Sequence, residues 1–181
     1  LGAAKQALDA LAEVVIENTA IRLQLGLTLG DYQSVKEINN QSPAISEYNK
    51  CLEIDSKYVP ALYRKAKLYR GAKNNEEALK FFNEAIATDP TFAPSYREKA
   101  ELLKDRGQFE EAIASYAKYL ELNNSCRVQQ RYASFFYLTK NYDRAITEVT
   151  AAMPCNPDNH TLNRVLGYSF LELKNFADAK N

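Results

Sequence analysis

Two amphipathic segments joined by a turn make up residues 96–119, which read YREKAELLKDRGQFEEAIASYAKY. Tyr96, Ala100 and Leu103 recur at steps of three or four residues, and this spacing predicts a helix with one apolar face. The same steps resume shortly after Gly107, where a tight turn is expected. The stretch therefore predicts two antiparallel helices that form one hairpin.

This hairpin is one copy of a repeat that runs along the chain. Its second helix carries an alanine that recurs every 33 or 34 residues, as Ala78, Ala112, Ala145 and Ala179. A period of about 34 residues is typical of stacked helix-turn-helix units. Small residues on the preceding helix should face these alanines and let the helices approach closely; they are Ala66, Ala100, Ala133 and Gly167.

The pattern resembles the tetratricopeptide repeat family over about residues 23–181. The resemblance implies an all-α fold, a right-handed superhelical solenoid of antiparallel helical hairpins that bury their apolar faces by stacking. One departure from the family is the absence of tryptophan at the early aromatic place of each repeat. The residues that stand there are Leu62, Tyr96, Gln129 and Asn163.

We predict a single array over residues 1–181. Residues 1–18 are expected to form the second helix of a leading repeat, and both ends resemble fragment ends. The repeats that follow span residues 20–56, 59–90, 93–124, 126–157 and 160–181, the last of them truncated. The first full repeat has two extra residues in its turn, where Gln41 or Ser42 should cap the second helix and Pro43 should open it.

The charge balance argues against binding driven by a net field. The chain holds 23 basic and 23 acidic residues, so we expect neither nucleic acid nor an anionic membrane surface as a partner. No stretch approaches the roughly 18 apolar residues that a membrane span needs. Membrane insertion is therefore not expected.

No motif of catalysis, metal binding or cofactor binding stands out. The single histidine, His160, is expected near a helix start, and no Cys, Asp or Glu lies at ligand spacing on the same face. Phosphate-binding loops, dinucleotide fingerprints, zinc-protease motifs and nucleophile elbows are missing. The sequence predicts no enzyme, no metal and no cofactor.

The three cysteines differ in their expected surroundings. Cys51 falls on an inward place of its helix and should be buried as a small hydrophobe. Cys126 is expected to open a first helix and Cys155 to close the second helix of the same hairpin, so antiparallel packing would bring the two together. A disulfide would require a Cα separation below about 7 Å and an oxidising compartment, and the sequence leaves this pairing open.

Family resemblance implies that the first helices line a concave groove that grips a peptide or a partner helix. The groove residues expected from the pattern are Tyr63, Lys67, Arg70, Arg97, Glu101, Lys104, Arg127, Gln130, Arg131, Tyr137, Arg164 and Tyr168. Arginine and tyrosine concentrate binding energy at interfaces, and a carboxylate would find donors here. The alternative, that these charges are merely solvated, stays open. A chaperone-tail clamp is not expected, because Glu98 stands at one of its places.

Function follows from the same resemblance. It favours a protein-protein interaction scaffold that binds a peptide or partner protein in the groove, with acidic partners suited to the basic lining. One alternative is an assembly module that self-associates through its open C-terminal end. Another is an accessory repeat region of a larger enzyme or transport component. Resemblance to bacterial cell-envelope repeat proteins favours a bacterial origin and the periplasm or envelope over the cytoplasm, while the compartment stays unknown.

Overall fold

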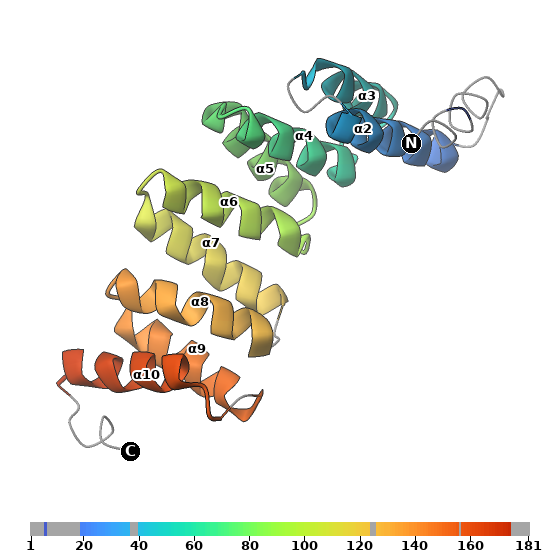
Figure 1. The fold of residues 1–181 in the computed structure, drawn as a ribbon. Coiled ribbons are helices and arrows are strands. Elements are labelled where there is room, and N and C mark those ends of the chain that lie inside the picture. Colours follow the sequence, from blue (N-terminus) through green and yellow to red (C-terminus); the bar gives the residue numbers. More distant parts are fainter. Residues whose placement is uncertain (1–5, 7–18, 37–39, 124–125, 156, 175–181) are drawn as a thin grey trace. The chain divides into compact units, whose positions relative to one another are not determined.

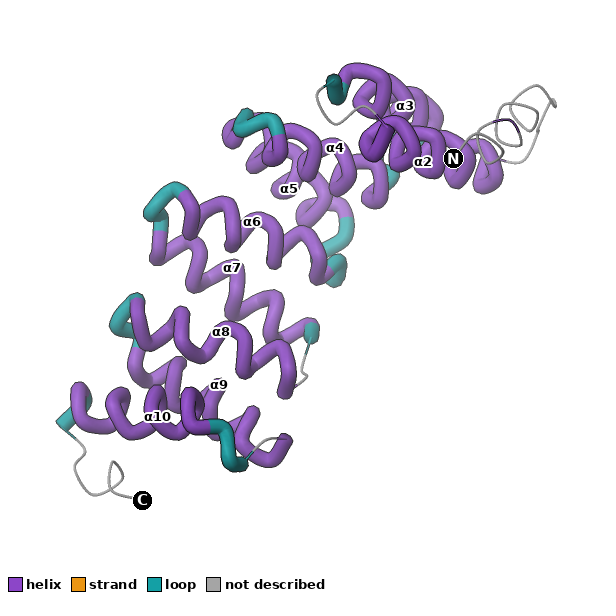
Figure 2. Tube along the Cα trace, viewed as in Figure 1, coloured by secondary structure: helices purple, strands orange, loops and turns teal. Residues whose placement is uncertain are grey.

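The computed structural model describes residues 6, 19–36, 40–123, 126–155 and 157–174, without the side chains of Cys126, Arg127 and Arg131. Over these residues the secondary structure is helical, and no strand occurs among them (Figures 1 and 2). The predicted fold class, an all-α solenoid of helical hairpins, is confirmed. The helix predicted within residues 1–18 lies outside the described residues, apart from Gln6.

The helices alternate between first and second members of hairpins. The first members are α2 (Thr19–Lys36), α4 (Val59–Gly71), α6 (Ala93–Asp105), α8 (Cys126–Leu138) and α10 (His160–Glu172). The second members are α3 (Ser42–Ile54), α5 (Asn75–Thr88), α7 (Phe109–Leu122) and α9 (Tyr142–Ala152), the last followed by the 3₁₀ helix η1 (Met153–Cys155).

Contacts between Cα atoms divide the chain into two compact units, Leu1–Glu98 and Lys99–Asn181. Helices α2 to α5 belong to the N-terminal unit, helices α7 to α10 belong to the C-terminal unit, and α6 contains the boundary. Each unit is described by itself below. The single array over residues 1–181 stays a prediction.

One turn geometry ends the first helix of three hairpins. Lys73, Gly107 and Lys140 have φ values of 60°, 74° and 60°, in the left-handed region. In each case the next residue donates its amide to a carbonyl five residues earlier, as Asn141 does to Phe136 at 2.8 Å. This bond pattern satisfies the last carbonyls of the helix. Because Asn141 also caps α9 through its side chain, the two helices follow each other with almost no loop.

Small residues line the contact between the two helices of a hairpin. The alanines predicted to meet there are fully buried wherever the structure describes them; they are Ala66, Ala78, Ala100, Ala112, Ala133 and Ala145. In the first hairpin glycine takes this role, because a Cβ on Gly30 would lie only 2.2 Å from a ring carbon of Tyr48. Close packing of helices thus explains the small residues.

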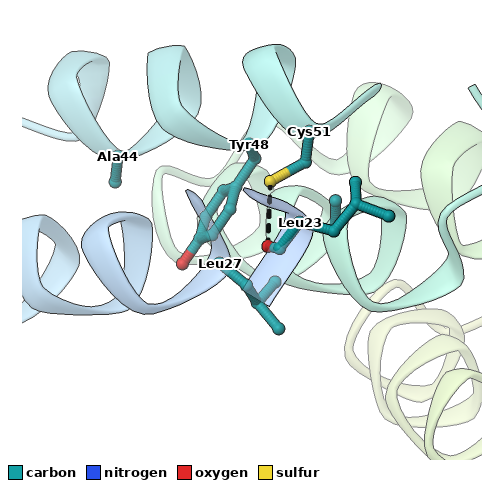
Figure 3. Close-up of a cluster of buried hydrophobic side chains, with 6 residues drawn as sticks. Leu23, Leu27, Ala44, Tyr48 and Cys51 are labelled. Atoms are coloured by element: carbon teal, nitrogen blue, oxygen red, sulfur yellow. Dashed lines mark hydrogen bonds between the residues drawn. The ribbon is translucent and has the colours of Figure 1, made fainter. Parts of the chain in front are cut away.

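The first hairpin has its own apolar core, drawn in Figure 3. Leu23 and Leu27 of α2 pack against Ala44, Tyr48 and Cys51 of α3. The Cys51 thiol donates to the carbonyl of Leu23, with 3.6 Å between Sγ and O. Burial raises the pKa of this thiol. The predicted burial of Cys51 is confirmed.

The turn before α3 is capped differently from the expectation. Gln41 occupies the N-cap position but makes no side-chain cap bond, and Pro43 lies in the first turn as predicted. The side chain of Asn40 accepts the amide of Ser42 at 3.2 Å. The side chain of Asn40 is shorter than that of Gln41 and lies one residue earlier, so its oxygen can reach this amide. Asn40 therefore provides the acceptor for the backbone amide at the start of α3.

Aromatic rings fill the contact between α7 and α8 in the C-terminal unit. The ring centroid of Tyr116 lies 4.4 Å from that of Tyr132 and 4.8 Å from that of Phe135. Burial, together with the nearby carboxylate of Glu101, raises the pKa of Tyr116. This cluster stabilises the stacking of successive hairpins on which the C-terminal unit depends.

Candidate functional site

A half-open cavity of about 330 Å³ lies between α8 and α10 in the C-terminal unit. These are first helices of neighbouring hairpins, and both pack against α9 (Figure 1). The residues that line the cavity, called the α8–α10 pocket below, are Ser134, Tyr137, Leu138, Thr161, Arg164, Val165 and Tyr168.

Two caps hold the helices that form this pocket. The turn at Lys140 and Asn141 ends α8 and begins α9. The side chain of Asn159 accepts the amides of Thr161 and Leu162 at 3.0 and 3.1 Å, and so begins α10. These caps fix the end of α8 and the start of α10. The pocket residues therefore project from helices, and no loop is needed to position them.

Tyrosine rings form one wall of the pocket. The ring centroid of Tyr137 lies 6.3 Å from that of Tyr168 and 5.8 Å from that of Tyr142. Burial, followed by the nearby charge of Glu172, raises the pKa of Tyr142. The wall therefore connects α8, the start of α9 and α10 through ring contacts.

Apolar side chains at the mouth of the pocket remain accessible. Leu138 is 75% exposed and Tyr168 is 48% exposed, whereas Val165 is 6% exposed. Large hydrophobic residues with this much exposure, gathered around one cavity, are typical of a binding surface. The pocket can accept an apolar group.

Arg164 supplies the only charge among the pocket residues that the structure describes. It lies exposed on α10, one helical turn after the exposed His160. No carboxylate lines this pocket among the described residues, and the guanidinium of Arg164 lies exposed on a mostly apolar surface. The electrostatics therefore favour a ligand that carries a carboxylate beside an apolar group.

The predicted groove residues of the N-terminal unit are largely engaged by their neighbours. Glu98 accepts from Arg70 at 2.6 Å and from Arg97 at 2.7 Å, so one carboxylate pairs with both arginines. Tyr63 is buried, and its ring meets that of Phe92 at 5.3 Å. The ammonium of Lys67 lies 5.7 Å from the centroid of the Tyr63 ring.

The remaining predicted residues lie in the C-terminal unit. Lys104 forms an ion pair with Glu101, one turn earlier on the same helix. Gln130 is half-buried on α8. Arg127 and Arg131 belong to α8, but their side chains lie outside the described part of the chain. Thus the structure brings together Tyr137, Arg164 and Tyr168 out of the predicted set.

Sequence reasoning did not predict Leu138, Thr161 or Val165 as residues of the groove. Leu138 is the last residue of α8 and directly precedes the turn, where an apolar residue is expected to fold back onto its hairpin. The exposure of Leu138 marks it as a candidate site residue, and this exposure is known only from the structure. Val165 forms part of the pocket because α10 turns this side toward α8.

The described residues offer no arrangement for metal binding or membrane crossing. No three His, Cys, Asp or Glu side chains among them gather where a metal ion could bind. None of the helices in this part of the chain is long and apolar enough to cross a membrane. His160 is exposed, as expected for a surface residue at a helix start.

Comparison with known proteins points to one family. Tetratricopeptide repeat families match residues 59–92 and 81–114. No curated protein matches the sequence.

Solved structures share the fold at low identity. YrrB, described as a TPR protein with an unusual peptide-binding site, has a TM-score of 0.70 and 18% identity over 96% of this chain and 87% of its own. A tetratricopeptide repeat protein of Parabacteroides merdae has a TM-score of 0.65 and 20% identity over 98% of this chain and 68% of its own. MamA has a TM-score of 0.66 and 18% identity, with coverage of 87% and 86%.

Proposed function

The chain is a tetratricopeptide repeat protein, and from this premise we propose that it is an interaction scaffold that binds an extended peptide of a partner protein at the α8–α10 pocket. The observation that carries the proposal is the pocket itself. Exposed apolar side chains and one accessible arginine converge there from two first helices. Such a combination gives both buried area and orientation to a bound peptide.

Charges in the N-terminal unit support this choice of site. Arg70 and Arg97 share the carboxylate of Glu98, so a partner carboxylate would have to displace a residue of the chain itself. Displacement costs the energy of the existing pairs, which are short and partly shielded from solvent. Arg164, in contrast, forms no ion pair with a carboxylate in the part of the chain that the structure describes, so a partner carboxylate would displace none there.

Selection from a random peptide library on the 181-residue chain tests the proposal. We expect enriched peptides whose binding falls at least about tenfold when Tyr168→Ala removes the exposed ring, because aromatic anchors concentrate binding energy. Phe109→Ala is the matched control, since Phe109 is a similarly exposed aromatic residue (45% against 48%) on α7 of the same unit. The variant F109A should bind the peptides unchanged. Peptides that bind wild type and Y168A equally would refute the site.

A further inference from the structure

We propose that the α8–α10 pocket selects an extended segment in which an acidic, an apolar and a basic residue occupy alternate positions. This inference rests on the proposed function and adds the class of peptide. It is drawn from three side chains spaced four residues apart on α10, namely Arg164, Tyr168 and Glu172.

The spacing of these residues matches an extended peptide. Four residues of an α-helix rise about 6 Å. Two residues of an extended strand rise about 6.6 Å and bring side chains back to the same face. A peptide laid along α10 can therefore set every second side chain against Arg164, Tyr168 and Glu172 in turn. In a helical ligand, by contrast, the side chains that share one face recur every three or four residues rather than every two.

The acidic residue of the bound peptide is placed against Arg164. Its guanidinium lies exposed at a pocket whose described residues include no carboxylate, and a ligand carboxylate can accept two of its N–H groups. The preceding turn of α10 adds no opposing charge, because the residue there is His160. A basic residue at this position would be repelled.

The apolar position is assigned to the centre of the pocket. Tyr137, Leu138 and Tyr168 surround it, and Val165 lies buried beneath. Its volume of about 330 Å³ is near the lower end of the range for ligand sites, which suits one apolar side chain rather than a helix face. Covering Leu138 and Tyr168 would remove exposed apolar area from water.

The basic residue of the bound peptide is placed against Glu172, at the exposed end of α10. Burial and the nearby charge of Glu172 raise the pKa of Tyr142, and the ring of Tyr142 contacts that of Tyr137 in the pocket wall. A carboxylate accepts hydrogen bonds from the ammonium of a lysine or the guanidinium of an arginine. Charge thus changes from positive at Arg164 to negative at Glu172 along α10, and the ligand carries the opposite order.

Anisotropy titration of three labelled peptides against the 181-residue chain tests the inference. The probe is Gly-Asp-Ser-Leu-Ser-Lys-Gly, and the composition control is Gly-Leu-Ser-Ser-Asp-Lys-Gly. We expect the probe to bind at least about fivefold more tightly, because only its charges and apolar group alternate in register with α10. Equal affinity of the two peptides would overturn the inference.

A charge swap makes the test independent of folding. Arg164→Glu should weaken the probe by about tenfold and should instead favour a third peptide, Gly-Lys-Ser-Leu-Ser-Lys-Gly. Arg22→Glu, at an exposed arginine of α2, is the matched control and should leave both affinities unchanged. A variant R164E whose preference does not switch would overturn the inference. The inference would also be overturned if the selected library peptides depend on Tyr168 but lack alternating acidic, apolar and basic residues. That result would leave the proposed function intact.

Discussion

Glu98 determines the charge of the predicted groove in the N-terminal unit. The sequence places Arg70 and Arg97 on first helices, where they indicate a basic lining. Both donate to Glu98, a half-buried neighbour whose side chain is 12% exposed. A count of the basic residues along a helix face therefore overstates the charge that a partner would meet, because the carboxylate of Glu98 offsets one of the two arginine charges.

Glu148 is a buried carboxylate on α9, and it makes the stability of the chain depend on pH. It is 3% exposed and lies 2.8 Å from Nε of Arg144. Burial raises the pKa of Glu148 above its ordinary value near 4.5, and the charge of Arg144 opposes this shift. Since the folded state then binds a proton more tightly than the unfolded state, acidification through the folded pKa toward 4.5 stabilises the fold.

Glu148→Gln should remove this pH dependence. We expect wild type to gain stability relative to E148Q as the pH falls from 7 to about 4, by an amount on the order of 1 kcal/mol for each unit of pKa shift. Urea unfolding of both proteins across this range measures the difference. Other carboxylates, such as Asp89, are common to both proteins and cancel. A difference that stays constant, or that changes in favour of E148Q on acidification, would contradict the assignment.

At the scale of the elements, side-chain size sets the distance between the two helices of a hairpin. In the first hairpin, Tyr48 of α3 packs over the bare backbone of Gly30 in α2. Its hydroxyl donates to Asp31 at 2.7 Å, and Asp31 in turn pairs with Arg64 of α4 at 2.5 Å. Burial, reinforced by the bond to Asp31, raises the pKa of Tyr48. The contacts that join α2, α3 and α4 here therefore all involve Tyr48 or its partner Asp31.

Gly30→Ala should therefore destabilise the chain by about 1–3 kcal/mol, because the added methyl group overlaps the Tyr48 ring and forces α2 and α3 apart. Gly71→Ala provides the control: Gly71 ends α4, and nothing lies within 4 Å of the position of its Cβ. That change should be neutral or stabilising by up to about 1 kcal/mol, since alanine is the better helix former. Thermal unfolding compares them, and equal effects would show that contact with Tyr48 does not matter.

On the scale of the whole molecule, the division into two compact units should be visible in local stability. Stacked repeats are stabilised mainly by their immediate neighbours, so damage to one hairpin need not spread along the chain. Opening free energies can then differ between one end and the other.

Amide hydrogen exchange of the Gly30→Ala variant tests this independence. We expect faster exchange in α2, α3 and α4, which share the Tyr48, Asp31 and Arg64 contacts. The amides of α8, α9 and α10 should exchange as in wild type, because they belong to the other unit. A uniform acceleration over the described helices would instead indicate one cooperative unfolding transition.

The fold followed from local patterns in the sequence. Apolar residues at steps of three and four, alanines every 33 or 34 residues and the inward place of Cys51 predict features that depend on neighbours within one hairpin. These are short-range consequences of helix geometry. The cap before α3 was the exception, because Asn40, Gln41 and Ser42 are all chemically suitable and only backbone geometry selects Asn40.

The amino-acid sequence by itself determined the helices, their pairing into hairpins and the helix on which each predicted site residue lies. Only the tertiary structure decided which of those residues meet. Glu98 reaches Arg70 across 28 positions, and Leu138 joins Tyr168 at one pocket, because successive hairpins stack with a particular rotation and offset. That stacking depends on the sum of many contacts between hairpins, such as the rings of Tyr116 and Tyr132, and no local period encodes it.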